Sequence, residues 1–365
     1  MNILKTSISI ILLVFIFDLL INLILPESIK KKIGITKNYS LKSERFHHEI
    51  SNNIDLPEFW GETKYQVVTN NYGMRTGNGY KIDKNKPTIG FMGDSFVYGS
   101  GIDYNDHFIQ SLIDQNENYN FQNLAYVSYS PSIYYKKLRY FINEKKIQFK
   151  SIYLFVDTSD VQDEGVFYRE DKKGNIVRKW ISDEKNNKRN FKYKFKNYFK
   201  QNSFIFKFYE IFSTSSVRDG SLNCLKNKKN ITNFKNYLDY KRFSYGFDRK
   251  TQNEPWVQEG KEKVLLYLSK INNFLISKNI NLILVYYPSA IEILEEINLH
   301  NSEHYKLLKN WSDENKIEFI DTTNKFNLLN SGLDNYKANH ILCDAHWNKS
   351  GHNIIAKYVQ RNLDM

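Results

Sequence analysis

Apolar and polar residues alternate in blocks along most of the chain, and the blocks predict strands and helices in turn. The segment KPTIGFMGDS has a short apolar run that ends at Gly93, as expected of a buried parallel strand, and DHFIQSLIDQ has helical spacing. The alternation continues through a strand near 120–125, a helix in SIYYKKLRYFINEKK and a strand in SIYLFV. Successive units of strand, helix and strand predict an α/β domain around a parallel sheet.

The same pattern returns towards the carboxyl end of the chain. KEKVLLYLSKINNFLISK has helical spacing, and NLILVYY is typical of a buried strand. Helices near 288–297 and over 302–314 then lead to IEFIDT, the last predicted strand of the sheet. The final helix, SGHNIIAKYVQRNL, carries four apolar residues on one stripe: Ile354, Ile355, Val359 and Leu363.

Two segments interrupt this pattern. Residues 27–85 are mixed and polar, and predict an extended lead-in with short strands. Residues from about 164 to 256 form a basic insertion in which FKYKFKNYFKQNSFIFKFYEIF alternates lysine with aromatic rings. We therefore divide the chain into residues 1–26, the lead-in at 27–85 and an α/β domain at 86–365 that the insertion interrupts.

The apolar stretch at the amino terminus predicts a membrane anchor. Residues 3–25 are long enough to cross a bilayer, which takes roughly 20 residues, although Asp18 lies inside the stretch. No small-residue cleavage site follows, so an anchor is favoured over a cleaved signal. Three lysines, at 30–32, follow the stretch, and the positive-inside rule would then place the body in the cytoplasm.

Composition excludes a disordered chain, because 15% of the residues are aromatic. The net charge of +12 is concentrated in residues 161–256, which hold 22 lysines and arginines against 11 acidic residues. Such a segment could attract anionic lipid, acidic polysaccharide or nucleic acid, or form a solvated face. The two cysteines, Cys224 and Cys343, are too few for a disulfide framework or a zinc site, and could form one bridge.

The turn after the first strand of the sheet is a candidate for chemistry. GFMGDSFVYGSG places Asp94 and Ser95 between strand and helix, at the edge where open α/β sheets hold functional residues. Gly93 would permit a sharp turn, and the N–H of Ser95 would point at a bound anion. Ser95 is therefore either a nucleophile or only the cap of its helix.

A serine nucleophile needs a base and a carboxylate that orients it, and the other end of the chain offers both. In CDAHWNKSGHNIIA, Asp344 and His346 lie in a loop just ahead of the last helix. If this loop bends back, Asp344 can reach Nδ1 of the imidazole ring. That contact would fix the tautomer that leaves Nε2 of His346 for Ser95.

These two motifs, with NNYGMR upstream and NLAYVSYSPSIYY between them, resemble the SGNH/GDSL hydrolase superfamily, especially its membrane-anchored bacterial members. The resemblance covers roughly residues 65–160 and 260–360. It implies a flavodoxin-like three-layer α/β/α sandwich, and ester hydrolysis or acyl transfer through an acyl-serine without a cofactor. Carried over by position, it makes Ser95 the nucleophile, His346 the base and Asp344 the orienting carboxylate.

The resemblance also implies an oxyanion hole. Its donors would be the N–H of Ser95, the N–H of Ser128 at a family glycine position, and the side chain of Ser159 where the family has asparagine. Serine has a shorter side chain, and losing one well-placed donor costs about 3 kcal/mol of transition-state stabilisation. The Asp-x-His spacing is also shorter than the commoner family pattern, in which the aspartate would stand at Cys343.

Other polar residues are predicted to support the site rather than to react. The supporting set is Gly93, Asp94, Asn123 and Asp160. The acidic cluster Asp157, Asp160 and Asp163 could hold a divalent cation, but orienting loops or capping the next element is favoured, and no metal is predicted. The HHE motif at 47–49 lacks the spacing that puts two histidines on one helix face, so a surface or packing role is predicted.

We carry two main functional hypotheses from the sequence. The first is a serine-dependent esterase or O-acyltransferase that acts on an acyl ester of envelope polysaccharide or lipid, with the body outside the cytoplasm as in the anchored enzymes it resembles. The second is a protein that keeps the fold but has little or no activity and serves in glycan binding or assembly, because Ser159 replaces asparagine. Nucleic-acid binding by the insertion ranks last, since an anchored acyl-transfer site gives nucleic acid no role.

Overall fold

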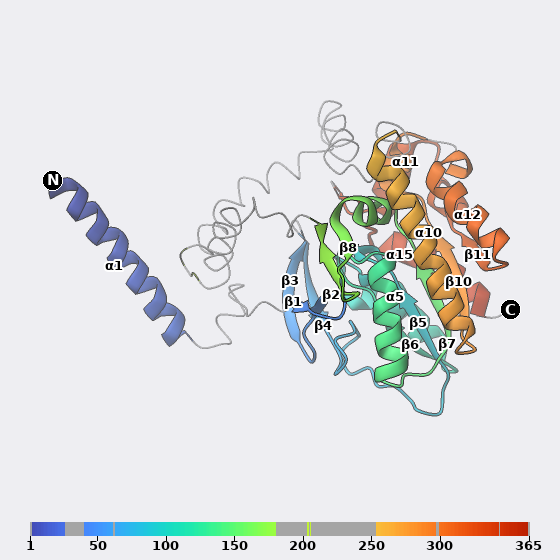
Figure 1. Ribbon diagram of the computed structural model, residues 1–365, viewed down its shortest axis with the longest axis horizontal. Coiled ribbons are helices and arrows are strands. Elements are labelled where there is room, and N and C mark those ends of the chain that lie inside the picture. The colour runs from blue at the N-terminus through green and yellow to red at the C-terminus, as the bar shows by residue number, and fades with distance from the viewer. Residues whose placement is uncertain are drawn as a thin grey trace.

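A five-stranded parallel sheet forms the centre of the computed structural model of the chain (Figure 1). The structure describes residues 2–25, 40–60, 63–179, 203, 205, 253–296, 299–342 and 344–363. The strands are β5 (Thr88–Met92), β6 (Asn120–Asn123), β7 (Phe149–Phe155), β10 (Asn281–Tyr286) and β11 (Glu318–Asp321). They lie in the order β11-β10-β7-β5-β6, and every neighbouring pair is parallel.

The strand order reverses its direction between β5 and β7. From β5 the chain moves to β6 on one side, and then returns to β7, β10 and β11 on the other side. This is the flavodoxin-like order, in which ligands bind beyond the carboxyl ends of the strands where the direction reverses. All five residues of β5 are buried, which agrees with a central strand covered on both faces.

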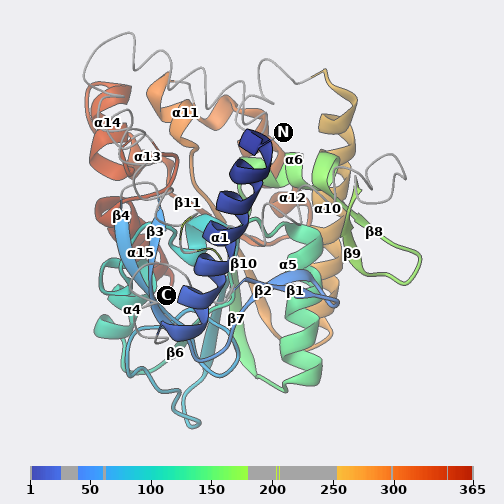
Figure 2. The ribbon, with the colours of Figure 1, turned by 90° about the vertical axis from the view of Figure 1, so that its left-hand side faces the viewer.

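Helices cover both faces of the sheet (Figure 2). On one face, α4 (Phe108–Gln115) packs against α15 (Lys349–Leu363), and on the other α5 (Pro131–Arg139) packs against α10 (Pro255–Ile276). The helix α12 (Glu303–Glu314) connects β10 to β11 and contacts both strands. The α/β class with a parallel central sheet is therefore confirmed.

The lead-in forms two antiparallel hairpins that belong to the same core as the sheet. The first joins β1 (Ser40–Ser43) to β2 (His47–Ile50), and the second joins β3 (Asp55–Trp60) to β4 (Thr63–Val68). Their apolar side chains are part of one hydrophobic core with the strands and helices of the α/β domain. The lead-in is thus packed onto the body instead of being a linker to it.

The histidines of the HHE motif take part in this packing. His48 donates a hydrogen bond from Nε2 to the carbonyl of Val127 at 2.6 Å, and its ring lies against Tyr126 and Tyr129. Burial lowers the pKa of His48 to about 3, so the ring is neutral at physiological pH. The first hairpin is therefore held against the loop that carries Ser128.

Part of the predicted insertion is described. It begins with a short hairpin of β8 (Tyr168–Glu170) and β9 (Ile176–Arg178), and ends where α10 starts at Pro255. The rest of the insertion, both cysteines and the lysines at 30–32 lie outside the described residues. The remaining helices around the site are α3 (Ser95–Tyr98), α6 (Thr158–Gln162), α11 (Ala290–Leu294), α13 (Thr323–Phe326) and α14 (Gly332–Asn339).

The amino-terminal segment forms one helix, α1 (Asn2–Ile24). In the part of the chain that the structure describes, no helix combines the length and the apolar character that a membrane crossing requires. The anchor predicted over residues 3–25 is therefore not confirmed.

Candidate active site

The turn from β5 into α3 places Ser95 at the carboxyl edge of the sheet. Asp94 is the cap of this helix, because its carboxylate accepts the backbone N–H of Phe96 at 3.0 Å. Ser95 is the first residue of the helix and is only 9% exposed. The interpretation of Ser95 as a cap is therefore wrong, and its hydroxyl is left for another contact.

Gly93 has a different role from the predicted one. Its φ angle lies outside the left-handed region, so the turn itself does not require glycine. The requirement is space, because a Cβ on Gly93 would lie 2.5 Å from Cγ2 of Val97. Glycine conformation matters instead at Gly99, which ends α3 with φ 82°.

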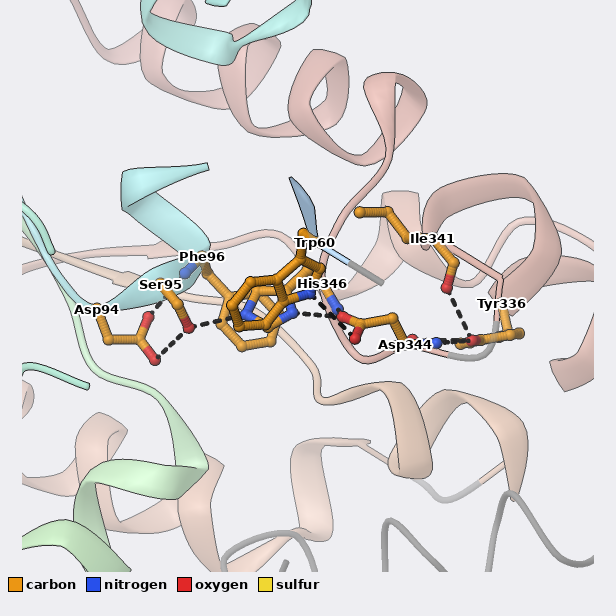
Figure 3. A network of polar contacts seen from close by, with 8 residues as sticks. All are labelled: Trp60, Asp94, Ser95, Phe96, Tyr336, Ile341, Asp344 and His346. Carbon is orange, nitrogen blue, oxygen red and sulfur yellow. Dashed lines mark hydrogen bonds and ion pairs between the residues drawn. The ribbon is translucent and has the colours of Figure 1, made fainter. Parts of the chain in front are cut away.

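The structure brings Ser95, His346 and Asp344 together in one line of contacts (Figure 3). The hydroxyl of Ser95 lies 2.7 Å from Nε2 of His346, and 3.5 Å from the carboxylate of Asp94, so the imidazole is its partner. Nδ1 of His346 contacts Oδ1 of Asp344. A proton on Nδ1 that is donated to the carboxylate leaves Nε2 free to accept the serine proton, which is the arrangement of an activated serine.

Neighbouring aromatic residues hold the histidine loop in place. The indole N–H of Trp60 donates to Oδ2 of Asp344 at 3.1 Å, and the Trp60 ring lies edge-to-face against His346. Phe96 stacks on the same imidazole with ring centres 4.7 Å apart. The hydroxyl of Tyr336 lies 2.8 Å from the carbonyl of Asp344 and accepts the backbone N–H of Asp344 at 3.1 Å. The loop is thus fixed through both its side chains and its backbone.

Arg75 of the NNYGMR segment holds the other end of α3. Its guanidinium is buried and donates to four backbone carbonyls, those of Gln66, Tyr98, Gly99 and Ile102. Asn123, at the end of β6, donates from its side chain to the carbonyl of Val97 at 2.8 Å. Both residues therefore position the helix that carries Ser95 and have no contact with its hydroxyl.

Buried carboxyl groups lie behind Ser95. Burial, followed by the nearby carboxylate of Asp157, raises the pKa of Asp94 to about 7. Burial, followed by repulsion from neighbouring carboxylates, also raises the pKa of Asp160 and of Asp163 well above the usual range. Asp157 caps α6, and Asp160 completes the capping box and accepts the hydroxyl of Tyr134 at 3.1 Å. Capping is thus what the structure shows for Asp157 and Asp160 of the acidic cluster.

We expect Asp94→Asn to stabilise the protein increasingly as pH rises from about 4 to about 7. The folded-state pKa of Asp94 lies above its unfolded value, so its contribution to stability is present at low pH and is lost as pH rises through the folded value. Asparagine keeps the cap but carries no charge. Urea unfolding of both proteins between pH 4 and 8 measures the difference, and a difference independent of pH would contradict the assignment.

The two other predicted oxyanion donors differ in what the structure shows. Ser128 has φ 58°, a backbone conformation that glycine adopts most easily, and its carbonyl accepts the hydroxyl of Tyr168. Ser159 donates its hydroxyl to Asp157 at 2.5 Å, and its N–H also goes to Asp157. A serine hydroxyl has one proton, so in this conformation Ser159 has none left for an oxyanion. The roles of Ser95 and Ser128 as backbone donors stay predictions.

The site residues that sequence reasoning missed have no motif of their own. Trp60 and Tyr336 reach Asp344 from segments in which no chemistry was predicted. Arg75 lies in a segment that the family resemblance did mark, but its contacts could not be anticipated. Among the described residues, no group of three or more histidine, cysteine, aspartate or glutamate side chains is arranged to hold a metal ion.

Comparison with known proteins gives matches to solved structures alone. No protein-family model matches the sequence, and no curated protein matches it. A member of the lipolytic G-D-S-L family from Veillonella parvula DSM 2008 is 14% identical and covers 75% of this chain and 96% of its own, with a TM-score of 0.38. The acetyl xylan esterase AlAXEase is 13% identical and covers 76% of this chain and 99% of its own, with a TM-score of 0.41.

A third similar structure is a catalytic mutant of Axe2, an acetylxylan esterase from Geobacillus stearothermophilus. It is 11% identical and covers 78% of this chain and 96% of its own, with a TM-score of 0.39. The structural neighbours are therefore lipolytic G-D-S-L proteins and esterases.

Proposed function

We propose that the protein is a serine-dependent esterase or O-acyltransferase. The observation that supports this most directly is the 2.7 Å contact between the Ser95 hydroxyl and Nε2 of His346, with Asp344 on the opposite nitrogen of the ring. The three side chains come from the start of α3 and from the loop before α15, near the two ends of the α/β domain, and meet beyond the carboxyl end of β5. A structural role alone would not need a hydroxyl, an imidazole and a carboxylate in this order.

The proposed reaction follows from the position of the protons. Oγ of Ser95 attacks the carbonyl carbon of an ester while its proton moves to Nε2 of His346, and Asp344 stabilises the imidazolium that forms. The tetrahedral intermediate collapses to an acyl-serine, and His346 returns the proton to the departing alcohol. Water or another hydroxyl then attacks the acyl group and loses its proton to His346. The bond between the acyl carbon and Oγ of Ser95 breaks, and His346 returns the proton to that oxygen.

The substrate that we propose is an acyl ester of a carbohydrate or lipid of the cell envelope. Anchoring through residues 3–25, with the catalytic body outside the cytoplasm, is part of the same proposal and is motivated by the anchored enzymes that the motifs resemble. The three lysines after the apolar stretch argue for the opposite orientation. A reporter enzyme fused to the carboxyl terminus, active on one side of the membrane only, tests the orientation.

The activity itself is tested with Ser95→Ala. We expect the purified protein to hydrolyse a small chromogenic acyl ester and to react with a fluorophosphonate at Ser95, and we expect Ser95→Ala to lose both properties while it keeps its circular dichroism spectrum. Peptide mapping identifies the labelled serine. Turnover that Ser95→Ala leaves unchanged would remove the proposed mechanism.

A second candidate function is a binding or assembly role without useful catalysis. The contact between Ser159 and Asp157 favours this second function. While the Ser159 hydroxyl is bonded to Asp157, it cannot serve as the third oxyanion donor. This hypothesis expects no reaction with fluorophosphonate, even at long times and high pH. The enzyme hypothesis expects fluorophosphonate to label Ser95, and expects substitution of His346 or Asp344 to slow that labelling.

A further inference from the structure

Trp60 connects the lead-in to the histidine loop. It is the last residue of β3, 284 positions before Asp344 in the sequence, and its indole N–H donates to Oδ2 of that carboxylate at 3.1 Å. Figure 3 shows the indole beside the imidazole, with its nitrogen directed at Asp344.

The two oxygens of Asp344 have different partners. Oδ1 accepts from His346, through both the ring Nδ1 and the backbone N–H, the latter at 2.9 Å. Oδ2 accepts from Trp60. Because a carboxylate held at both oxygens cannot turn about its last side-chain bond, Trp60 keeps Oδ1 directed at the imidazole. A hydrogen bond to a charged group is also stronger than one between neutral groups.

Trp60 also limits the movement of the imidazole itself. Its ring lies 4.8 Å from that of His346 at an interplanar angle of 80°, while Phe96 stacks on His346 at 29°. The chain leaves room for the indole at Gly101, where φ is +81° and a Cβ would lie 3.2 Å from Cδ1 of Trp60. The ring that would accept the serine proton is therefore held by contacts from β3 and from α3.

We propose that Trp60 is a positioning residue for this reaction, and that the second lead-in hairpin is part of the catalytic apparatus. Trp60 acts on Ser95 through Asp344 and His346 and does not touch the ester. The proposal rests on the proposed function, since positioning has meaning only if Ser95 reacts. It predicts that removing the indole N–H slows the chemical step and leaves substrate binding nearly unchanged.

The test compares Trp60→Phe with Trp311→Phe. Both substitutions remove an indole N–H and keep an aromatic ring, and Trp311 donates to Oγ of Ser269 at 3.1 Å, on α12 and away from the site. We expect kcat of Trp60→Phe to fall about tenfold or more, the usual scale for a hydrogen bond to a charged group, with KM within about twofold. Trp311→Phe should keep the wild-type kcat.

A double-mutant cycle separates positioning from a general structural role. In the Asp344→Ala background the carboxylate is gone, so Trp60→Phe should cost less than about twofold. A structural defect would cost the same factor in both backgrounds. Where turnover is too slow to measure, the rate of fluorophosphonate labelling at Ser95 is compared in place of kcat. Each rate is divided by the amount of protein that is labelled when the reaction is complete, so that unfolded protein is not counted.

The outcomes distinguish this proposal from the one that it rests on. If Ser95→Ala keeps turnover and labelling, the proposed function fails and the positioning role fails with it. Suppose that Ser95→Ala is inactive but that Trp60→Phe keeps the kcat of Trp311→Phe, or that Trp60→Phe lowers the rate by the same factor in the wild-type and Asp344→Ala backgrounds. Either result overturns the role of Trp60 alone. A loss in kcat that disappears in Asp344→Ala supports it.

Discussion

Replacing His346 with glutamine is expected to lower kcat for a small acyl ester by about 10⁴-fold or more. Glutamine is polar and of similar reach, so it can still contact the Ser95 hydroxyl, but its amide cannot take up the proton that the serine must lose. The 2.7 Å contact with Nε2 would then remain as a hydrogen bond without a base. Steady-state hydrolysis, with protein normalised by circular dichroism, measures the loss.

His300→Gln is the matched control for that substitution. His300 also contacts an aspartate, Asp321 at 2.9 Å, but its side chain is 48% exposed and it is not among the Ser95 contacts. We expect its kcat to stay within about twofold of wild type, as is usual for surface substitutions away from a site. A variant at His346 that retains more than about a tenth of the activity would mean that another group serves as the base.

Replacing Arg75 with methionine is expected to lower the free energy of unfolding by about 3 kcal/mol or more. The side chain is 1% exposed, and its guanidinium donates to carbonyls of the last residue of α3, of the loop that follows α3 and of β4. Methionine fills similar volume but cannot donate to those carbonyls. The carbonyl of Gly99 keeps the N–H of Ile102 at 3.3 Å, whereas each buried acceptor that loses its partner costs roughly 1–3 kcal/mol. Urea unfolding at neutral pH measures the change.

Arg45→Met is the control for Arg75. Arg45 makes a 3.7 Å ion pair with Glu144, in which both side chains are more than half exposed. An exposed pair of this kind contributes at most about 1 kcal/mol, so the control should be nearly neutral. Equal losses in the two variants would contradict the claim that Arg75 acts through its backbone contacts to the segment around α3.

Most elements of the α/β domain were predictable because each of these has a local cause. The apolar run of β5 is bounded by turn residues, and the stripe on α15 places Ile355 and Val359 in the core, where the structure finds them. The residues proposed to react were predictable too. A serine directly after a strand and an Asp-x-His motif directly before a helix are each recognisable in the local sequence. Helices α13 and α14 carried no clear apolar period and were missed.

The contacts that complete the site were not predictable, because they join residues whose local sequence has no chemical signal. In the sequence, Trp60 has no feature that distinguishes it from other strand residues. Only the folded hairpin brings its indole N–H to Asp344. From the sequence, Ser159 is a possible oxyanion donor, but in the structure the cap of α6 directs its hydroxyl at Asp157. Gly93 was expected to serve the turn, whereas the side chain of Val97 is what excludes a Cβ there.

The sequence by itself therefore determined the five strands of the central sheet, most of the helices of the α/β domain and the identity of the three side chains proposed to react, since these depend on periodicity and on short motifs. Only the tertiary structure decided which partner each polar group takes. Hydrogen bonds depend on distances of about 3 Å between atoms that are far apart along the chain, and packing of the lead-in against the sheet sets those distances.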